Sequence, residues 1–422
     1  MRSKSCLQYF KMSEIVDHVS SILAEDSGDA DNGQDLRLFK TFLKEINEAP
    51  ASDAVPRARL TPSTYVPDPD PRTIAPFDTM DRFKDPLYAA EHGRLSVVQW
   101  LYKCMREIPA YDDNLFLKWM CESAAKGGHL EILRWLRENG CPWHQEAICN
   151  FAAKHGNLEC LKWAHDNGGP LFTRQGFKSD TFSHICQYAA SGGALNCLRW
   201  ARDNWCPWSW STCHNAARNG HWDCLMFAHQ NGCPLHKSIV YEAAKNGHLD
   251  CLKYAHQNGC PWDEGTCSQA ACNGHLDCLK YAHQNGAPWD EGTCSQAACN
   301  GHLDCLTFAH QNGCPWHEKT CSQAAYNGHL DCLTFAHQNG CPWDENTCSR
   351  AAYYGHLDCL KYAHQNGCPW NEETCSEAAR GGHLDCLKYA HQNGCPWDEE
   401  TCYQAARRSE CLEYARQNGC PE

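Results

Sequence analysis

A unit of 27 residues repeats along the chain, and it constrains the fold more than any other feature of the sequence. The segments Gly247–Asn273 and Gly274–Asn300 differ only where Cys260 is replaced by Ala287. Further copies begin at Gly220, Gly301, Gly328, Gly355 and Gly382, and diverged copies extend back to about residue 86. A fixed period of this length is typical of stacked supersecondary units rather than of one globular core.

Each unit predicts two short antiparallel helices, and its length leaves no room for a strand. The residue after each Cys-Pro-Trp is usually a good N-cap, as at Asp263, Asp290, Asp344, Asp398 and Ser209, so the first helix (helix A) begins there. The second helix (helix B) carries an apolar face and ends at His-Gln-Asn-Gly, where glycine followed by proline is a strong stop signal. In the unit around Cys294, we expect Cys294, Ala297 and Ala298 of helix A to face inward, as do Leu303, Cys305, Leu306, Phe308 and Ala309 of helix B.

Outside the repeats, residues 1–80 do not repeat and combine an acidic stretch with a proline-rich tract. We therefore predict a largely disordered leader over residues 1–80 and a repeat array over residues 81–422. The charges of the last unit, Arg407 and Glu413 among them, suit a terminal repeat whose outer side faces water. The chain lacks a long apolar run, and its net charge of −14 disfavours binding to nucleic acid or anionic membranes. We expect an intracellular, cytoplasmic monomer that binds neither.

The 33 cysteines fall mostly at three positions of the unit. Each position accepts small or apolar residues in sibling units, since Cys305 corresponds to Val97, Cys294 to Val240, and Cys314 to Ala287. Metal ligands and disulfide halves do not tolerate such exchanges, so we interpret these cysteines as small buried hydrophobes in a reducing compartment. We expect no metal site and no cofactor.

Histidines and aromatic residues also recur at fixed positions. His283 corresponds to Arg137 and Arg202, which do not bind metals, and we expect this position to hydrogen-bond the last carbonyls of helix B. His275 is expected to tie neighbouring turns together. The tryptophans of the Cys-Pro-Trp segments, such as Trp289, are predicted to seal the edge between repeats. No catalytic motif is present in the sequence, so we expect the protein not to be an enzyme.

Two early units carry the resemblance to a known family. PLYAAEHGRLSVVQWL at residues 86–101 and SAAKGGHLEILRWLRENG at Ser123–Gly140 resemble the ankyrin repeat. The resemblance extends over about 340 residues and twelve units. It implies an all-α, ankyrin-like helix-pair solenoid with the β-finger mostly lost, because the unit is shorter than the usual ankyrin repeat of about 33 residues.

Candidate binding residues are those at which sibling repeats differ, because packed positions are constrained by their neighbours and outward ones diverge. They form one stripe along helix A, which in ankyrin-like stacks lines the concave groove. We expect these side chains to point away from the stack. The candidates are Lys319, Tyr326, Arg350, Tyr353, Tyr354, Glu373, Glu377 and Arg380, and a possible recognition loop between residues 169 and 180 adds Phe172, Arg174, Phe177 and Lys178.

These observations predict a protein-interaction scaffold or adaptor that binds a protein or peptide along its concave helix-A face. One version is an adaptor in a ubiquitin-ligase or similar assembly. Two alternatives stay open at this stage. One is a metal buffer rich in cysteine and histidine, and the other is a recently expanded array with no dedicated partner.

Overall fold

The computed structural model describes residues 86–106, 114–168, 184–344, 346–370 and 373–421. The chain divides into two compact units, Met1–Phe172 and Thr173–Glu422. The boundary between them falls in the possible recognition loop between residues 169 and 180, which lies outside the described residues. Within the described residues every regular element is a helix, as the length of the repeat predicts.

Helices alternate between the two repeat positions, so that even-numbered helices are helix A and odd-numbered ones helix B. The helices of unit 1 are α4 (Pro86–Glu91), α5 (Leu95–Arg106), α6 (Asn114–Gly127), α7 (Leu130–Glu138), α8 (Gln145–Lys154) and α9 (Leu158–Asp166). The helices of unit 2 are α10 (His184–Ser191), α11 (Leu195–Asp203), α12 (Trp210–Arg218), α13 (Trp222–Gln230), α14 (Ser238–Lys245), α15 (Leu249–Gln257), α16 (Thr266–Cys272), α17 (Leu276–Gln284), α18 (Glu291–Cys299), α19 (Leu303–Gln311), α20 (Thr320–Tyr326), α21 (Leu330–Gln338), α22 (Thr347–Tyr353), α23 (Leu357–Gln365), α24 (Thr374–Gly381), α25 (Leu384–Gln392), α26 (Glu399–Ala405) and α27 (Ser409–Gln417).

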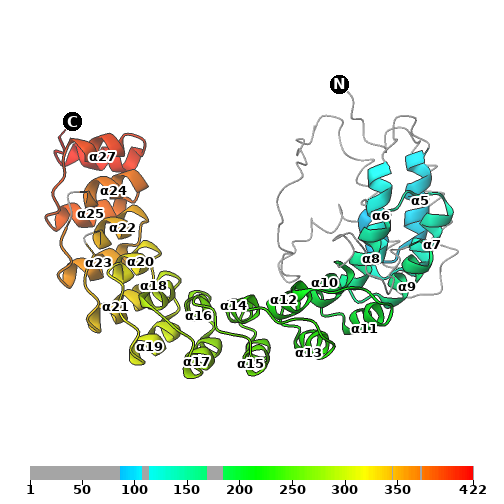
Figure 1. The fold of residues 1–422 in the computed structure, drawn as a ribbon. Coiled ribbons are helices and arrows are strands. Elements are labelled where there is room, and N and C mark those ends of the chain that lie inside the picture. Colours follow the sequence, from blue (N-terminus) through cyan, green and yellow to red (C-terminus); the bar gives the residue numbers. More distant parts are fainter. Residues whose placement is uncertain (1–85, 107–113, 169–183, 345, 371–372, 422) are drawn as a thin grey trace, which may run out of the picture. The chain divides into compact units, whose positions relative to one another are not determined.

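Unit 2 consists of two layers. Each helix A packs against the helix A of the next repeat and against its own helix B. The even-numbered helices line the inner side of the curved unit and the odd-numbered ones its outer side (Figure 1). The core between the layers is made of small side chains, as predicted: Cys294, Ala297, Ala298 and Leu306 are fully buried. The helix-A stripe is thereby turned towards the concave side.

Glycine in the left-handed region ends both helices of a repeat. After α18, Gly301 has a φ of 75°, and the N–H of His302 donates to the carbonyl of Ala297 at 2.9 Å. After α19, Gly313 has a φ of 86°, and the N–H of Cys314 donates to the carbonyl of Ala309 at 3.0 Å. Both turns are Schellman motifs, which satisfy helix carbonyls that would otherwise lack a partner.

The starts of helix A match the prediction in some repeats and differ in others. Asp290 and Asp398 are N-cap residues whose side chains accept backbone hydrogen bonds, as expected. By contrast, α16 and α22 begin three residues after Asp263 and Asp344. In these repeats the aspartate side chain accepts a hydrogen bond from the N–H two residues later. The N–H of Gly265 donates to Asp263 at 3.1 Å, and that of Asn346 to Asp344 at 2.7 Å, so that a separate turn precedes the helix. The predicted caps Asp290 and Asp398 are therefore confirmed, whereas the N-cap residues of α16 and α22 are Gly265 and Asn346 rather than Asp263 and Asp344.

The histidine that precedes helix B ties neighbouring repeats together, as predicted. Nε2 of His248 lies 3.1 Å from the carbonyl oxygen of Arg218, in the repeat before. Because a carbonyl only accepts, Nε2 carries the proton in this hydrogen bond. A Cβ on Gly220 would lie 2.6 Å from the same ring, so the histidine packs directly on a glycine of its neighbour. Burial and the neighbouring His221 and His275 lower the pKa of His248.

We expect acidification from about pH 7.5 to 5.5 to lower the melting temperature by several degrees. Burial also lowers the pKa values of His275 and His329, so the unfolded chain takes up protons first. The stability that these groups contribute is present above the unfolded pKa of about 6.5 and is lost as the pH falls below it. Circular dichroism across this pH range measures the effect.

The matched variant for this experiment replaces His248, His275 and His329 with asparagine. Asn157 occupies the same position in a sibling repeat, where its amide donates to the carbonyls of Ala125 at 2.9 Å and Lys126 at 2.8 Å. Asparagine does not titrate, so the melting temperature of this variant should depend less on pH. An equal pH dependence in both proteins would show that other groups are responsible.

Candidate functional site

An open pocket of about 450 Å³ lies on the helix-A stripe of unit 2, between α22 and α24. It is lined by Asn346, Ser349, Arg350, Tyr353, Tyr354, Glu373, Glu377 and Arg380. Six of the eight stripe residues predicted from sequence thus line one concavity. Two of its residues, Asn346 and Ser349, were not among the candidates.

Three tyrosines form a cluster at the edge of this pocket. The rings of Tyr326 and Tyr354, from successive repeats, have centroids 4.1 Å apart, and Tyr353 meets Tyr354 edge to face at 4.6 Å. Tyr354 Oη–H donates to Tyr326 Oη at 2.8 Å. Tyr326 and Tyr354 nevertheless remain 38% and 40% exposed. Tyr326 and Tyr354 are thus exposed, as expected, whereas Tyr353 is half-buried. The tyrosines also contact one another across repeats, which the sequence analysis did not predict.

Charged residues of both signs flank the tyrosines. The guanidinium of Arg380 donates to Glu377 at 3.2 Å and lies 5.4 Å from the ring centroid of Tyr353. Arg350 donates to Ser322 Oγ of the preceding repeat at 3.1 Å. Glu373 is just ahead of α24, and its backbone carbonyl accepts from Ser376 at 3.0 Å. The pocket therefore combines aromatic faces with separated positive and negative groups, a mixture suited to polar and apolar contacts with a peptide.

The phenol of Tyr354 remains protonated at neutral pH. Its hydrogen bond to Tyr326 is the main reason that the pKa of Tyr354 is raised to about 12. Because the hydroxyl of Tyr354 is neutral, no phenolate charge lies beside the tyrosine rings. The pocket can thus bind a partner through hydrogen bonds that its phenol and guanidinium groups donate and its carboxylates accept.

The remaining predicted residues lie elsewhere. Tyr326 reaches the pocket only through Tyr354, whereas Lys319 is an exposed residue at the start of α20 and does not line the pocket. Phe172, Arg174, Phe177 and Lys178 lie outside the described residues. Comparison of sibling repeats could not have found Ser349, because they carry serine at the same position, as at Ser322 and Ser376.

The histidine at the end of helix B does not have the predicted role. Its ring stacks on the tryptophan of the following Cys-Pro-Trp, as His283 does on Trp289 with centroids 3.7 Å apart. Its sibling arginines do the same: Arg137 lies over Trp143 at 4.5 Å and Arg202 over Trp208 at 4.3 Å. Histidine and arginine can both occupy this position because each has a planar group that stacks on indole. The last carbonyls are instead bound by the asparagine amide two residues later, and Asn285 Nδ2 donates to the Tyr281 carbonyl at 2.8 Å.

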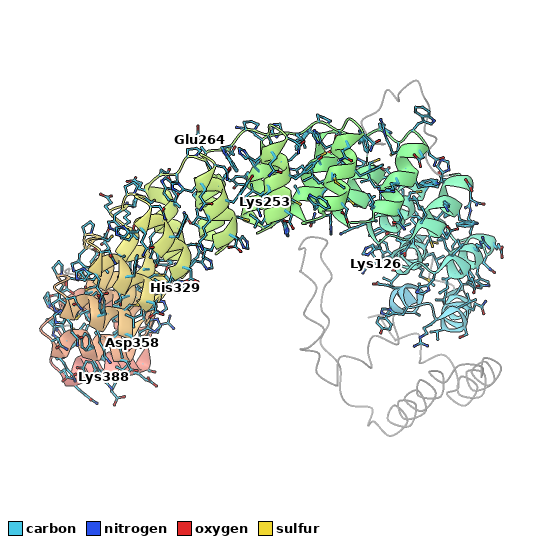
Figure 2. The ribbon with its side chains drawn as sticks, turned by 90° about the horizontal axis from the view of Figure 1, so that it is seen from below. Lys126, Lys253, Glu264, His329, Asp358 and Lys388 are labelled. Atoms are coloured by element: carbon cyan, nitrogen blue, oxygen red, sulfur yellow. The ribbon has the colours of Figure 1, made fainter. Side chains whose placement is uncertain are left out.

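The tryptophans close the edge between repeats, as predicted. The ring of Trp262 stacks on His256 at the end of α15 with centroids 4.3 Å apart, and its indole N–H donates to the carbonyl of Asn285 after α17 at 2.9 Å. This tryptophan therefore links two successive repeats. Glu264, beside such a tryptophan, and His329, at the turn between the two helices of a repeat, lie on opposite edges of unit 2 (Figure 2).

Cysteines at the three repeat positions are buried in the described part of the chain, and none of the described cysteines forms a disulfide. The thiol of Cys314 donates to the carbonyl of Asp290 at 3.1 Å. Burial is the main reason that the pKa values of Cys251 and Cys278 are raised to about 12. Over the described residues, no group of three or more potential ligands is arranged to hold a metal.

We expect a chelator and a reductant, added separately, to leave the helical circular-dichroism signal and the melting temperature of the chain unchanged. The reason is that a metal is bound by the thiolate, whereas helix-B thiols such as those of Cys251 and Cys278 are buried and have raised pKa values. Loss of helical signal after chelation would support the metal alternative. Loss after reduction would show disulfides that stabilise the fold.

The family described as ankyrin repeats (many copies) matches residues 121–165, which span the end of α6, all of α7 and α8, and α9 apart from its last residue. The chain therefore contains ankyrin repeats within residues 121–165. The solved structure of the human ASB11 ankyrin repeat domain is similar to it, with 20% identity over 38% of this chain and 85% of that one and a TM-score of 0.34. No curated protein matches the chain.

Ankyrin repeats are in general modules for protein–protein interaction, and ankyrin-repeat proteins are typically scaffolds without enzymatic activity. In the described part of the chain, none of the helices is both long and apolar enough to cross a membrane.

Proposed function

We propose that this protein is a scaffold or adaptor that binds another protein or peptide along the helix-A face of residues 184–421. The observation that supports the proposal is the pocket between α22 and α24, where six candidate residues from two repeats come together. Sibling repeats carry other residues at these positions, such as Gln296 and Cys299, so the pocket chemistry is a property of α22 and α24 rather than of the repeat. Exposed tyrosine and arginine are enriched among the residues that contribute most to interfaces.

The proposal also covers the location of the protein in the cell and its oligomeric state. We propose that the protein acts inside the cell as a monomer, with no enzymatic activity, cofactor, nucleic acid or membrane as part of its role. We also propose that residues 81–422 form the repeat region and that residues 1–80 form the leader before it. The net charge of −14 and the buried, protonated thiols support this setting.

Isolation of binding proteins with the immobilised full chain tests the proposal. We expect one protein or a small set to be retained in a saturable manner, and mass spectrometry identifies it. Elemental analysis of the chain purified from cells is the parallel measurement. Stoichiometric zinc or copper together with no saturable protein partner would contradict the scaffold and favour the metal buffer.

A further inference from the structure

Two buried cysteines lie side by side in most repeats of unit 2, one in helix A and one in the loop after helix B. In the repeat of α18, Sγ of Cys294 lies 3.9 Å from the carbonyl oxygen of Cys314, and a hydrogen bond joins the two thiols. We call such a couple a thiol pair. The arrangement recurs at Cys186 and Cys206, Cys213 and Cys233, Cys321 and Cys341, Cys348 and Cys368, Cys375 and Cys395, and Cys402 and Cys420.

Two repeats between these pairs carry only one of the two thiols and show what the second thiol changes. Cys260 faces Val240, and Sγ of Cys267 lies 3.9 Å from the carbonyl oxygen of Ala287. Burial raises the pKa of Cys260, and it raises the pKa of Cys267 to about 12. By contrast, the hydrogen bond from its partner thiol lowers the pKa of Cys314. Pairing therefore changes the chemistry of the loop cysteine and not only its packing.

The two members of a pair differ in reactivity. The hydrogen bond with Cys348 lowers the pKa of Cys368, as that with Cys375 lowers the pKa of Cys395. The loop cysteine is also nearer the surface, since Cys395 is 4% exposed and Cys375 is fully buried. The thiolate is the reactive form of cysteine. The loop cysteine is thus the nucleophile of the pair, and the helix-A cysteine is placed to react with it in a second step.

A pair of this kind can be oxidised by a peroxide in two balanced steps. The thiolate of the loop cysteine attacks one peroxide oxygen, the O–O bond breaks, and a sulfenic acid and hydroxide form. The sulfur of the helix-A cysteine then attacks the sulfenic sulfur, and the S–O bond breaks as the S–S bond forms. Two thiols lose two electrons and two protons, and hydrogen peroxide becomes two water molecules. No further reactant is needed.

We propose that the thiol pairs are sites of oxidative modification, at which hydrogen peroxide forms a disulfide between helix A and the loop after helix B of the same repeat. The chain folds with these thiols reduced, so a pair is not required for folding and its loss at Val240 or Ala287 is tolerated. A disulfide restricts the unfolded chain and thereby stabilises the fold. The proposal goes beyond the scaffold role and does not depend on it.

The test treats the reduced full chain with hydrogen peroxide well below its melting temperature. The chain is then denatured and alkylated, and its linked peptides are identified by mass spectrometry. We expect peptides that link Cys348 to Cys368 and Cys375 to Cys395, whereas Cys267 should be recovered in alkylated form. Oxidation should raise the melting temperature by at least about 5 °C, and a reductant should reverse both effects.

Cys368→Ala tests the pairing directly. Alanine is the residue that a sibling repeat carries at this position, as Ala287, so the variant should fold. Cys348 should then be recovered in alkylated form after peroxide treatment. The disulfide between Cys375 and Cys395 should form as in the natural chain, because that pair is intact.

Cys359→Val is the matched control variant. Cys359 is a buried cysteine of helix B in the same repeat, and a sibling repeat carries Val97 at this position, so both disulfides should still form. The proposal is overturned if peroxide forms no disulfide in the folded chain, or if linked peptides appear only above the melting temperature. It is also overturned if Cys267 is linked as readily as the pairs, or if Cys348 is linked to the same extent in Cys368→Ala.

Discussion

Alanine at Gly301 is expected to destabilise the protein by about 2–5 kcal/mol, whereas alanine at Gly313 in the same repeat should cost only about 1–2 kcal/mol. Both glycines have a positive φ, of 75° and 86°, so both substitutions carry the cost of a left-handed alanine. They differ in their surroundings. A Cβ on Gly301 would lie 2.5 Å from Nδ1 of His329, while one on Gly313 meets no atom within 4 Å. Denaturant unfolding of the two variants measures the difference.

The double variant Gly301→Ala/His329→Ala identifies the cause. If the clash with His329 is responsible, Gly301→Ala should cost no more in the His329→Ala background than Gly313→Ala does in the natural chain. Equal costs of Gly301→Ala in both backgrounds would show that the histidine ring moves aside at little cost. The contact between Gly301 and the His329 ring of the next repeat would then contribute little to stability.

Replacing Tyr326, Tyr353, Tyr354 and Arg380 with alanine is expected to weaken partner capture at least tenfold, which corresponds to about 1.4 kcal/mol. These four residues supply the aromatic surface and one of the cations at the pocket. The variant should stay folded but lose about 1–3 kcal/mol of stability, because the ring contacts between tyrosines and the cation–π contact of Arg380 are removed with it. Binding is therefore measured well below the melting temperature of the variant.

A control with the same number of substitutions uses the outer layer. Gln284, Gln311, Gln338 and Gln392 are exposed at the ends of α17, α19, α21 and α25, and their replacement with alanine should leave capture unchanged. Capture by the tyrosine variant equal to that of the natural chain would remove the helix-A face from consideration. Equal loss in both variants would indicate a general effect on the array.

Much of the fold was predictable because each structural rule is local to the repeat. The glycine after Asn312, the alanine pair at Ala297 and the aspartate at Asp290 each specify a helix end, a buried face or a cap from their immediate sequence. Comparison of sibling repeats also separated packed from outward positions. It therefore located most of the residues that line the pocket between α22 and α24.

The rest depended on contacts between repeats, which local rules do not contain. Stacking of His283 on Trp289 needs the path of the Cys-Pro-Trp loop, and the hydrogen bond from Tyr354 to Tyr326 needs the spacing of adjacent helices. The two helix A starts after Asp263 and Asp344 were misplaced because an aspartate can cap a turn as well as a helix. The pairing of Cys294 with Cys314 likewise needs the path of the loop after α19.

Hydrogen–deuterium exchange of the protein with and without its isolated partner is the most direct test of binding along the helix-A face. The account predicts that binding slows exchange in α22 and α24, on the inner layer of unit 2 (Figure 1), and leaves α23 and α25 on the outer layer unchanged. Protection confined to the odd-numbered helices, with α22 and α24 exchanging as in the free protein, would contradict it.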